Sequence, residues 1–191
     1  MFNTSEYVQL AAHASGRGDH LAALGFLREA LALEPKHAAA LYFFATECAE
    51  LGLVDRAASG LEEALVADGS MDVARFQLSL LYWQHGDATS AQRHLSHLRK
   101  AENEEVRAYA EAIVALMAND IERAKERLSH GLRIPSESGV LKRNMHNLFQ
   151  HLSAQPPVPK PVVEAEPQTA GAPKTLSTAL PGAYEQLRAA K

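Results

Sequence analysis

An internal repeat with a period of about 34 residues constrains the fold of this chain more than any other feature. The stretch GDHLAALGFLREALALEP begins at Gly18 and is matched by GLVDRAASGLEEALVADG from Gly52 and GDATSAQRHLSHLRKAEN from Gly86. A looser copy, NDIERAKERLSHGLRIPS, begins at Asn119. The copies share a small residue, then a leucine, then a small or apolar residue, at Ala23, Leu27 and Ala30; Ala57, Leu61 and Ala64; Ala91, Leu95 and Leu98; and Ala124, Leu128 and Gly131.

Each copy indicates a turn followed by a helix. Glycine adopts left-handed backbone at little cost, which suits the first position of the copy. Asp19, Asp87 and Asp120 follow the turn and are expected to cap the next helix by accepting from its free N–H groups. The recurring positions are spaced i, i+4 and i+7 and therefore share one helix face. The tripeptide Arg17-Gly18-Asp19 is thus interpreted as part of a turn rather than as an adhesion motif.

The period and the pattern resemble those of the tetratricopeptide repeat (TPR) family. The resemblance covers residues 4–153 and implies an all-α solenoid, a right-handed array of antiparallel helix pairs. The implied units are 4–37, 38–71, 72–104 and 105–137. The family's aromatic residue at the start of the first helix is Tyr7 in unit one, but Leu41 in unit two and Arg75 in unit three. In the first copy the match runs through Gly18, Asp19, Ala23, Leu27, Ala30, Leu31, Leu33 and Pro35.

One more amphipathic segment follows the repeats, and a tail of different composition follows that segment. The stretch SGVLKRNMHNLFQHLSA has apolar residues at helical spacing and resembles the solvating helix that closes such arrays. From Ala154 the chain is rich in proline, which favours extended backbone. We therefore predict a repeat domain at 1–153 and a disordered, flexible tail at 154–191. Near 176–188, Leu180, Tyr184 and Leu187 allow either a short helix that forms on docking or a frayed terminus.

Composition and charge argue against several classes of function. Hydrophobic residues make up 47% of the chain but aromatic residues only 6%, so alanine and leucine, both strong helix formers, supply much of the apolar material. The net charge of −4 predicts no nucleic-acid partner, and the lack of a long apolar run predicts no membrane segment. Cys48 is the only cysteine. With no secretory leader pattern, the expected location is cytoplasmic.

The TPR resemblance implies a concave groove lined by the first helix of each pair, where members of the family hold peptides. Mapping this sequence onto that frame gives an apolar, aromatic-rich surface with few charges, and such exposed surfaces usually serve an interface. The expected partner is therefore a protein or peptide, bound by a scaffold, adaptor or assembly factor. The predicted groove residues are Val8, Gln9, Tyr42, Phe43, Thr46, Phe76, Gln77, Leu80, Trp83, Tyr109 and Ile113.

Two subclasses of the family and one regulatory alternative bear on this prediction. Chaperone-binding members hold a terminal carboxylate with cations, but the corresponding positions here carry no Lys or Arg, which argues against that subclass: Ser5, Gln9, Phe43, Val73 and Gln77. A bacterial secretion-type chaperone for a translocator protein remains an alternative, because its aromatic groove is similar. A third possibility is that the tail, from Leu176 to Leu187, fills the groove until a partner displaces it.

No motif in the sequence points to catalysis, a cofactor or a metal. There is no nucleophile elbow and no phosphate-binding loop. His94 and His97 lie on a predicted outer helix without suitable acidic partners, so a solvated helix face is expected there. His20 is expected in an exposed first turn. An enzyme or a metal-binding protein is accordingly a minority alternative, and no cofactor is predicted.

Overall fold

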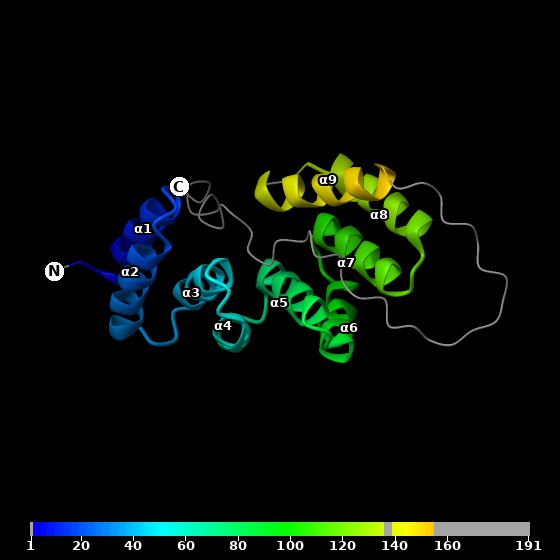
Figure 1. The fold of residues 1–191 in the computed structure, drawn as a ribbon. Helices are drawn as coiled ribbons and strands as arrows, with labels where there is room; N and C mark the ends of the chain where they lie inside the picture. Colours follow the sequence, from blue (N-terminus) through cyan, green and yellow to red (C-terminus); the bar gives the residue numbers. More distant parts are fainter. Residues whose placement is uncertain (1, 136–138, 155–191) are drawn as a thin grey trace.

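A computed structural model describes residues 2–135 and 139–154, and every regular element in this part of the chain is an α-helix (Figure 1). The predicted tail lies outside the described residues, apart from Ala154 at its start. The helices are, in chain order, α1 (Thr4–Ser15), α2 (His20–Leu33), α3 (Ala38–Glu50), α4 (Val54–Ala67), α5 (Asp72–Gln84), α6 (Ala88–Leu98), α7 (Glu104–Met117), α8 (Ile121–Arg133) and α9 (Gly139–Ala154).

The first eight helices form four antiparallel pairs, α1 with α2 through α7 with α8. Each predicted unit contains one pair, and successive pairs stack through α2 on α3, α4 on α5 and α6 on α7. The fold is therefore an all-α helical-repeat solenoid, as the period predicts. The pairs follow a curved path, with α4 and α6 on the outside and α9 across the inside above α7 (Figure 1). We call the surface of α1, α3, α5 and α7 that faces the inside of this curve the inner wall.

The turns inside the four pairs have the same backbone conformation. Gly18, Gly52, Gly86 and Asn119 have φ angles of 78°, 71°, 85° and 58°, all in the left-handed region. Glycine adopts the left-handed region without a steric clash, and asparagine is among the residues that tolerate this region best. This conformation explains why these residue types recur at the repeat period.

The predicted aspartate caps are present in three of the four pairs. A side-chain oxygen of Asp19 accepts from the backbone N–H of Ala22 at 3.0 Å, and Asp87 and Asp120 make the equivalent bonds at 2.9 and 3.1 Å. In the second pair Leu53 occupies the cap position and makes no side-chain bond. Each bond satisfies one of the free donors at a helix start, so the cap fixes where the second helix of the pair begins.

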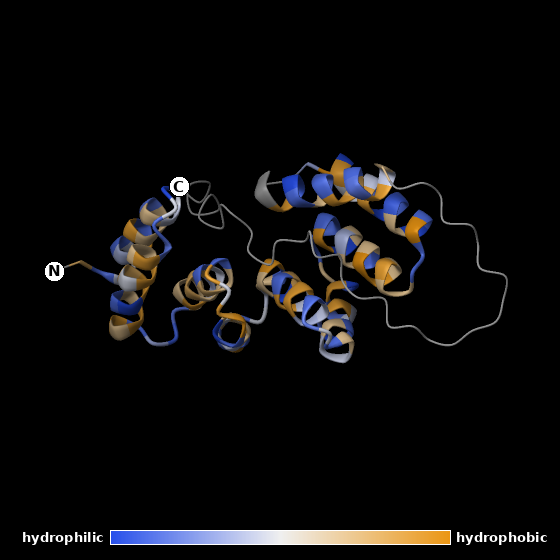
Figure 2. Ribbon diagram, in the orientation of Figure 1, coloured by the Kyte–Doolittle hydropathy of each residue, from blue (hydrophilic) through white to orange (hydrophobic). Residues whose placement is uncertain are grey.

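The buried side chains form two clusters. The N-terminal cluster contains buried residues from Val8 to Leu81, and the C-terminal cluster contains buried residues from Phe76 to Leu152. Helix α5 supplies both, because Leu78 and Leu81 belong to the first and Phe76 to the second. Hydrophobic and hydrophilic residues alternate around each helix in Figure 2, so most helices bury one face and solvate the other.

Candidate functional site

The inner wall is the candidate site, and its predicted residues lie on α1, α3, α5 and α7 as the repeat frame requires. Their exposure differs from the prediction. Of the eleven residues, Gln9 on α1 is exposed and the other ten are buried. The expectation of an exposed aromatic surface is therefore wrong for Val8, Tyr42, Phe43, Thr46, Phe76, Gln77, Leu80, Trp83, Tyr109 and Ile113.

On α5 and α7 the reason is that the predicted groove residues belong to the C-terminal cluster. Phe76, Leu80, Trp83 and Ile113 share this cluster with side chains of α6, α8 and α9. From α9 come four buried residues at helical spacing, Leu141, Met145, Leu148 and Leu152. Helix α9 packs against α8 and lies above α7 in Figure 1. The closing helix thus makes this part of the inner wall an interior.

Tyr109 is buried by a second device, the close approach of α7 to α8. A Cβ atom added to Gly131 on α8 would lie 2.5 Å from Cε1 of the Tyr109 ring, so only glycine leaves room for the ring. The Tyr109 hydroxyl donates to Oε1 of Glu105 at 3.0 Å, and both side chains are buried. Burial raises the pKa of Tyr109, and the Glu105 carboxylate raises it further. Tyr109 is therefore packed in the core between α7 and α8.

The inner wall of α3 and α5 holds buried polar side chains with unpaired atoms. Tyr42 is 3% exposed and Gln77 is 2% exposed, yet Tyr42 Oη and Gln77 Nε2 have no hydrogen-bond partner. Thr46 is buried beside them and donates from Oγ1 to the Tyr42 carbonyl at 2.9 Å. Burial raises the pKa of Tyr42, opposed in part by the nearby Gln77 amide and Thr46 hydroxyl. Both side chains thus lie near enough to Tyr42 Oη to act on its pKa as weak hydrogen-bond partners, but neither contact reaches the distance and angles of a hydrogen bond.

These unpaired atoms are informative because buried polar groups in native proteins nearly always have partners. Leaving one unpaired costs about 1–3 kcal/mol. Gln77 Nε2 is a donor that lacks an acceptor, and Tyr42 Oη can donate or accept. Both atoms can therefore donate to a carbonyl oxygen, which a main-chain amide supplies.

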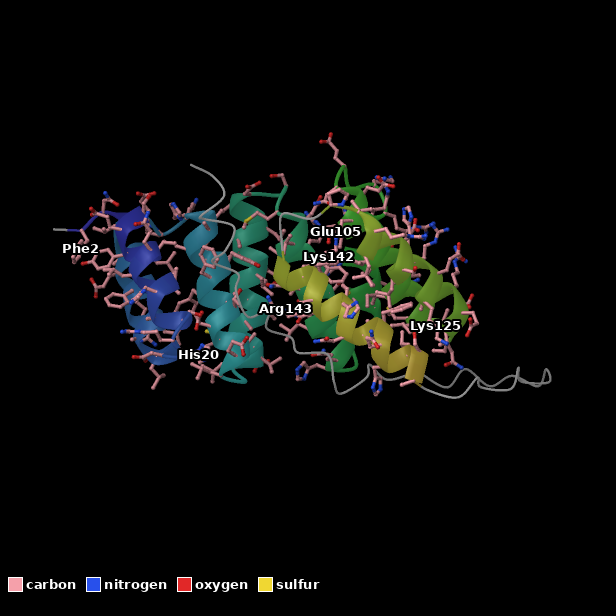
Figure 3. The ribbon with its side chains drawn as sticks, turned by 90° about the horizontal axis from the view of Figure 1, so that it is seen from above. Phe2, His20, Glu105, Lys125, Lys142 and Arg143 are labelled. Carbon is pink, nitrogen blue, oxygen red and sulfur yellow. The ribbon has the colours of Figure 1, made fainter. Side chains whose placement is uncertain are left out.

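His20 differs from the prediction of an exposed first turn, because it is partly buried. Its Nδ1 lies 2.7 Å from Oε2 of Glu47, a carboxylate only 1% exposed on α3 (Figure 3). Glu50, one turn further along α3, is half-buried; burial raises its pKa, against a lowering by His20. The pair links the start of α2 to α3 and joins the first two repeats. The recurrence of a turn in the sequence gave no signal for this bond, since its partner lies 27 residues away.

His94 also departs from the expected solvated face, whereas His97 is exposed as predicted. The His94 ring stacks on Tyr82 with ring centroids 5.8 Å apart and planes at 16°, and both ring nitrogens are buried without partners. Burial lowers the pKa of His94, and Arg93 and Arg75 lower it further. Tyr82 donates to Oε1 of Glu62 at 2.6 Å. The His94 ring is therefore half-buried because it packs against Tyr82 on the outer side of the array, and no ligand is needed to explain its burial.

The described residues give no sign of a metal centre or a membrane span. Within 2–135 and 139–154, no group of three His, Cys, Asp or Glu side chains is arranged to hold a metal ion. No helix in the same part of the chain is long and apolar enough to cross a bilayer. A shallow pocket between α6, α7 and α8 has charges of both signs on its rim, from Arg99, Glu111 and Arg123. That mixture selects neither an anion nor a cation.

Comparison with known proteins adds no relative to these observations. No protein-family model matches the chain, and no curated protein is significantly similar to it. The resemblance to tetratricopeptide repeats therefore stays a prediction, carried by the repeat residues themselves.

Proposed function

We propose that this chain is a non-catalytic protein-interaction module of the TPR type, a scaffold, adaptor or assembly factor, that binds an extended peptide segment across α3 and α5. The observation that carries the proposal is the pair of buried, unpaired polar atoms, Tyr42 Oη and Gln77 Nε2. A bound main-chain amide would satisfy both atoms and return the free energy lost to their desolvation. Because both side chains are buried, a partner reaches them only after the groups that cover them move aside.

The unpaired amide favours an extended ligand over a helical one. Inside a helix the main-chain carbonyls are already bonded to N–H groups four residues on, so they are poor acceptors for Gln77. An extended segment has free carbonyls and N–H groups, and apolar side chains on either side of them add contact with the surrounding wall. Affinity would then come from buried area and a few aligned hydrogen bonds, less the cost of association.

Binding is best tested by removing the polar atoms and keeping the fold. Phe76 and Trp83 are unsuitable because truncating either damages the C-terminal cluster. In Tyr42→Phe and Gln77→Met the side-chain volume is nearly kept. Each variant should bind a partner segment, identified by pull-down and mass spectrometry, about fivefold more weakly, the value of one net hydrogen bond.

The matched control is Gln9→Met on α1, because Gln9 is the exposed member of the predicted set. This variant makes the same chemical change on the same wall and should bind like the unaltered chain. Equal binding by all the variants, measured by calorimetry with a synthetic partner peptide, would remove the basis of the proposal.

A further inference from the structure

The chain contains a segment of its own that fits the polar pair. We infer that residues Leu176–Leu187 of the C-terminal tail dock in extended form against α3 and α5 in the free protein, so that a partner must displace them. The inference rests on the proposed function and names the resident occupant of the same surface. The chemistry of this segment, the length of chain that tethers it and the charge of the tail all suit the wall.

The chemistry of the segment matches the unpaired atoms. Pro181 disfavours helix at the residue before it, so Leu180 is held in extended backbone with its carbonyl free to accept from Gln77 Nε2. Proline has no N–H, so docking this bond buries no additional donor. Leu176 and Tyr184 flank the bond with apolar surface. The unpaired Gln77 amide therefore favours an extended docked form over the short helix that the spacing of Leu180, Tyr184 and Leu187 also allows.

The tether is long enough. Twenty-one residues, 155–175, separate the end of α9 from Leu176. They would span about 25 Å as a random coil and about 65 Å in the extended form that proline favours. Neighbouring packed helices are about 8–10 Å apart, which places α3 roughly 30 Å from α9 across α7 and α5. A tether of this size gives an effective concentration of about millimolar, so even a weak contact is occupied.

The charges are also compatible. Residues 155–191 contain four basic and three acidic side chains, while the whole chain has a net charge of −4. The tail is thus slightly positive and the remainder of the chain is negative. Two of the basic residues, Arg188 and Lys191, lie within four residues of the end of the docking segment. Opposite net charge steers the tail toward the folded part.

Hydrogen exchange on the full-length chain tests docking directly. In the unaltered protein, the amides of 176–187 should exchange about tenfold more slowly than those of the proline-rich stretch 158–166. The double variant Leu180→Asp/Tyr184→Asp should abolish this protection and increase exchange at the inner wall of α3 and α5. The matched control Val162→Asp/Val163→Asp, in the tether, should exchange like the unaltered chain. Equal exchange of 176–187 in all three proteins would overturn the inference.

A second measurement ties the segment to the polar pair. A fluorescein-labelled peptide of residues 174–191, followed by anisotropy, should bind the Leu180→Asp/Tyr184→Asp chain at least about tenfold more tightly than the unaltered chain, whose own tail competes. Adding Gln77→Met to the double variant should weaken this binding about fivefold. No binding to the double variant would also overturn the inference.

These outcomes separate the inference from the proposed function. A partner peptide whose binding depends on Gln77, combined with an unprotected tail, would leave the interaction module standing and remove only the resident segment. A docked tail combined with partner binding indifferent to Tyr42 and Gln77 would do the opposite, because the partner would then bind elsewhere.

Discussion

The N-terminal and C-terminal clusters are built on one repeat frame but bury different kinds of side chain on the inner wall. In the C-terminal cluster the wall carries large apolar groups such as Phe76, and its buried carboxylate, Glu105, accepts a hydrogen bond from Tyr109. On the wall of α3 and α5, Tyr42 and Gln77 are buried with polar atoms that have no partner. The Glu105–Tyr109 pair is satisfied within the fold, whereas Tyr42 Oη and Gln77 Nε2 are not.

The position of α9 accounts for the difference. Terminal repeats expose a face that lacks a neighbour, and a closing helix covers that face. Here α9 adds its apolar side chains to the C-terminal cluster, so the wall beneath it could become ordinary core. The same frame therefore carries a wall covered by α9 at one end and, under the proposed function, a binding wall nearer the other end.

The largest expected effect is on stability, from Phe76→Ala. Phe76 is fully buried in the C-terminal cluster, so its loss should lower the free energy of unfolding by about 3–5 kcal/mol. Gln9→Ala, on the exposed wall of α1, should change it by less than about 0.5 kcal/mol. Urea denaturation measures both. A small effect at Phe76 would mean that the two halves do not differ in the way described.

Replacing two glycines by alanine should change the stability of the chain in opposite directions. A Cβ at Gly131 would lie 2.5 Å from Cε1 and 2.8 Å from Cδ1 of Tyr109, so Gly131→Ala should destabilise by about 1–3 kcal/mol. Gly25 on α2 has no such neighbour within 4 Å, so Gly25→Ala should stabilise by about 0.5–1 kcal/mol through helix propensity. Thermal unfolding of the two variants checks the prediction, and a shift of the same sign in both would contradict it.

Tyr42→Phe should slightly raise the stability of the chain while it weakens binding. The Tyr42 hydroxyl is buried without a partner, so removing it ends a desolvation cost and should add about 0.5–1 kcal/mol to the free energy of unfolding. Denaturation in the absence of any partner measures this gain. A loss of stability instead would show that the hydroxyl is bonded within the fold.

The smallest effect is a dependence on pH through His94. Burial lowers its pKa, so the unfolded chain binds the proton more readily than the folded one. Stability should therefore decrease as the pH falls through about 6.5, the ordinary value for histidine. The half-exposed ring limits the effect to below about 1 kcal/mol.

Comparison of the unaltered chain with His94→Gln at pH 7.5 and 5.5 isolates this contribution. Burial raises the pKa of Glu50, so Glu50 titrates in the opposite sense, and its contribution cancels in the difference. If the two proteins lose the same stability on acidification, His94 is not responsible.

The sequence predicted the repeat frame well because that frame depends on local chemistry. The left-handed turn at Gly18, Gly52, Gly86 and Asn119 and the caps that follow it are set by residues within a few positions of each other. Such interactions leave a periodic pattern that needs no knowledge of distant contacts. The helix pairs, their order and the closing helix followed from that pattern.

Exposure on the inner wall could not be predicted in the same way. Whether Phe76 faces solvent depends on α9, which joins its cluster from some 70 residues away. The burial of Tyr109 depends on a glycine in the next helix, and the pairing of His20 depends on a carboxylate in the next repeat. Periodicity places a residue on a helix face, but only the packing of distant elements decides what lies against that face.

Helix α5, thirteen residues long, gives one face to each cluster. In a solenoid each repeat is usually coupled to its neighbours through the interface between them. Here the two buried clusters meet on one helix, α5. Among the described residues, a disturbance that passes from one cluster to the other is therefore expected to shift or rotate α5. Gln77 also lies on α5. A ligand bound to its amide would therefore restrain the helix that joins the two clusters.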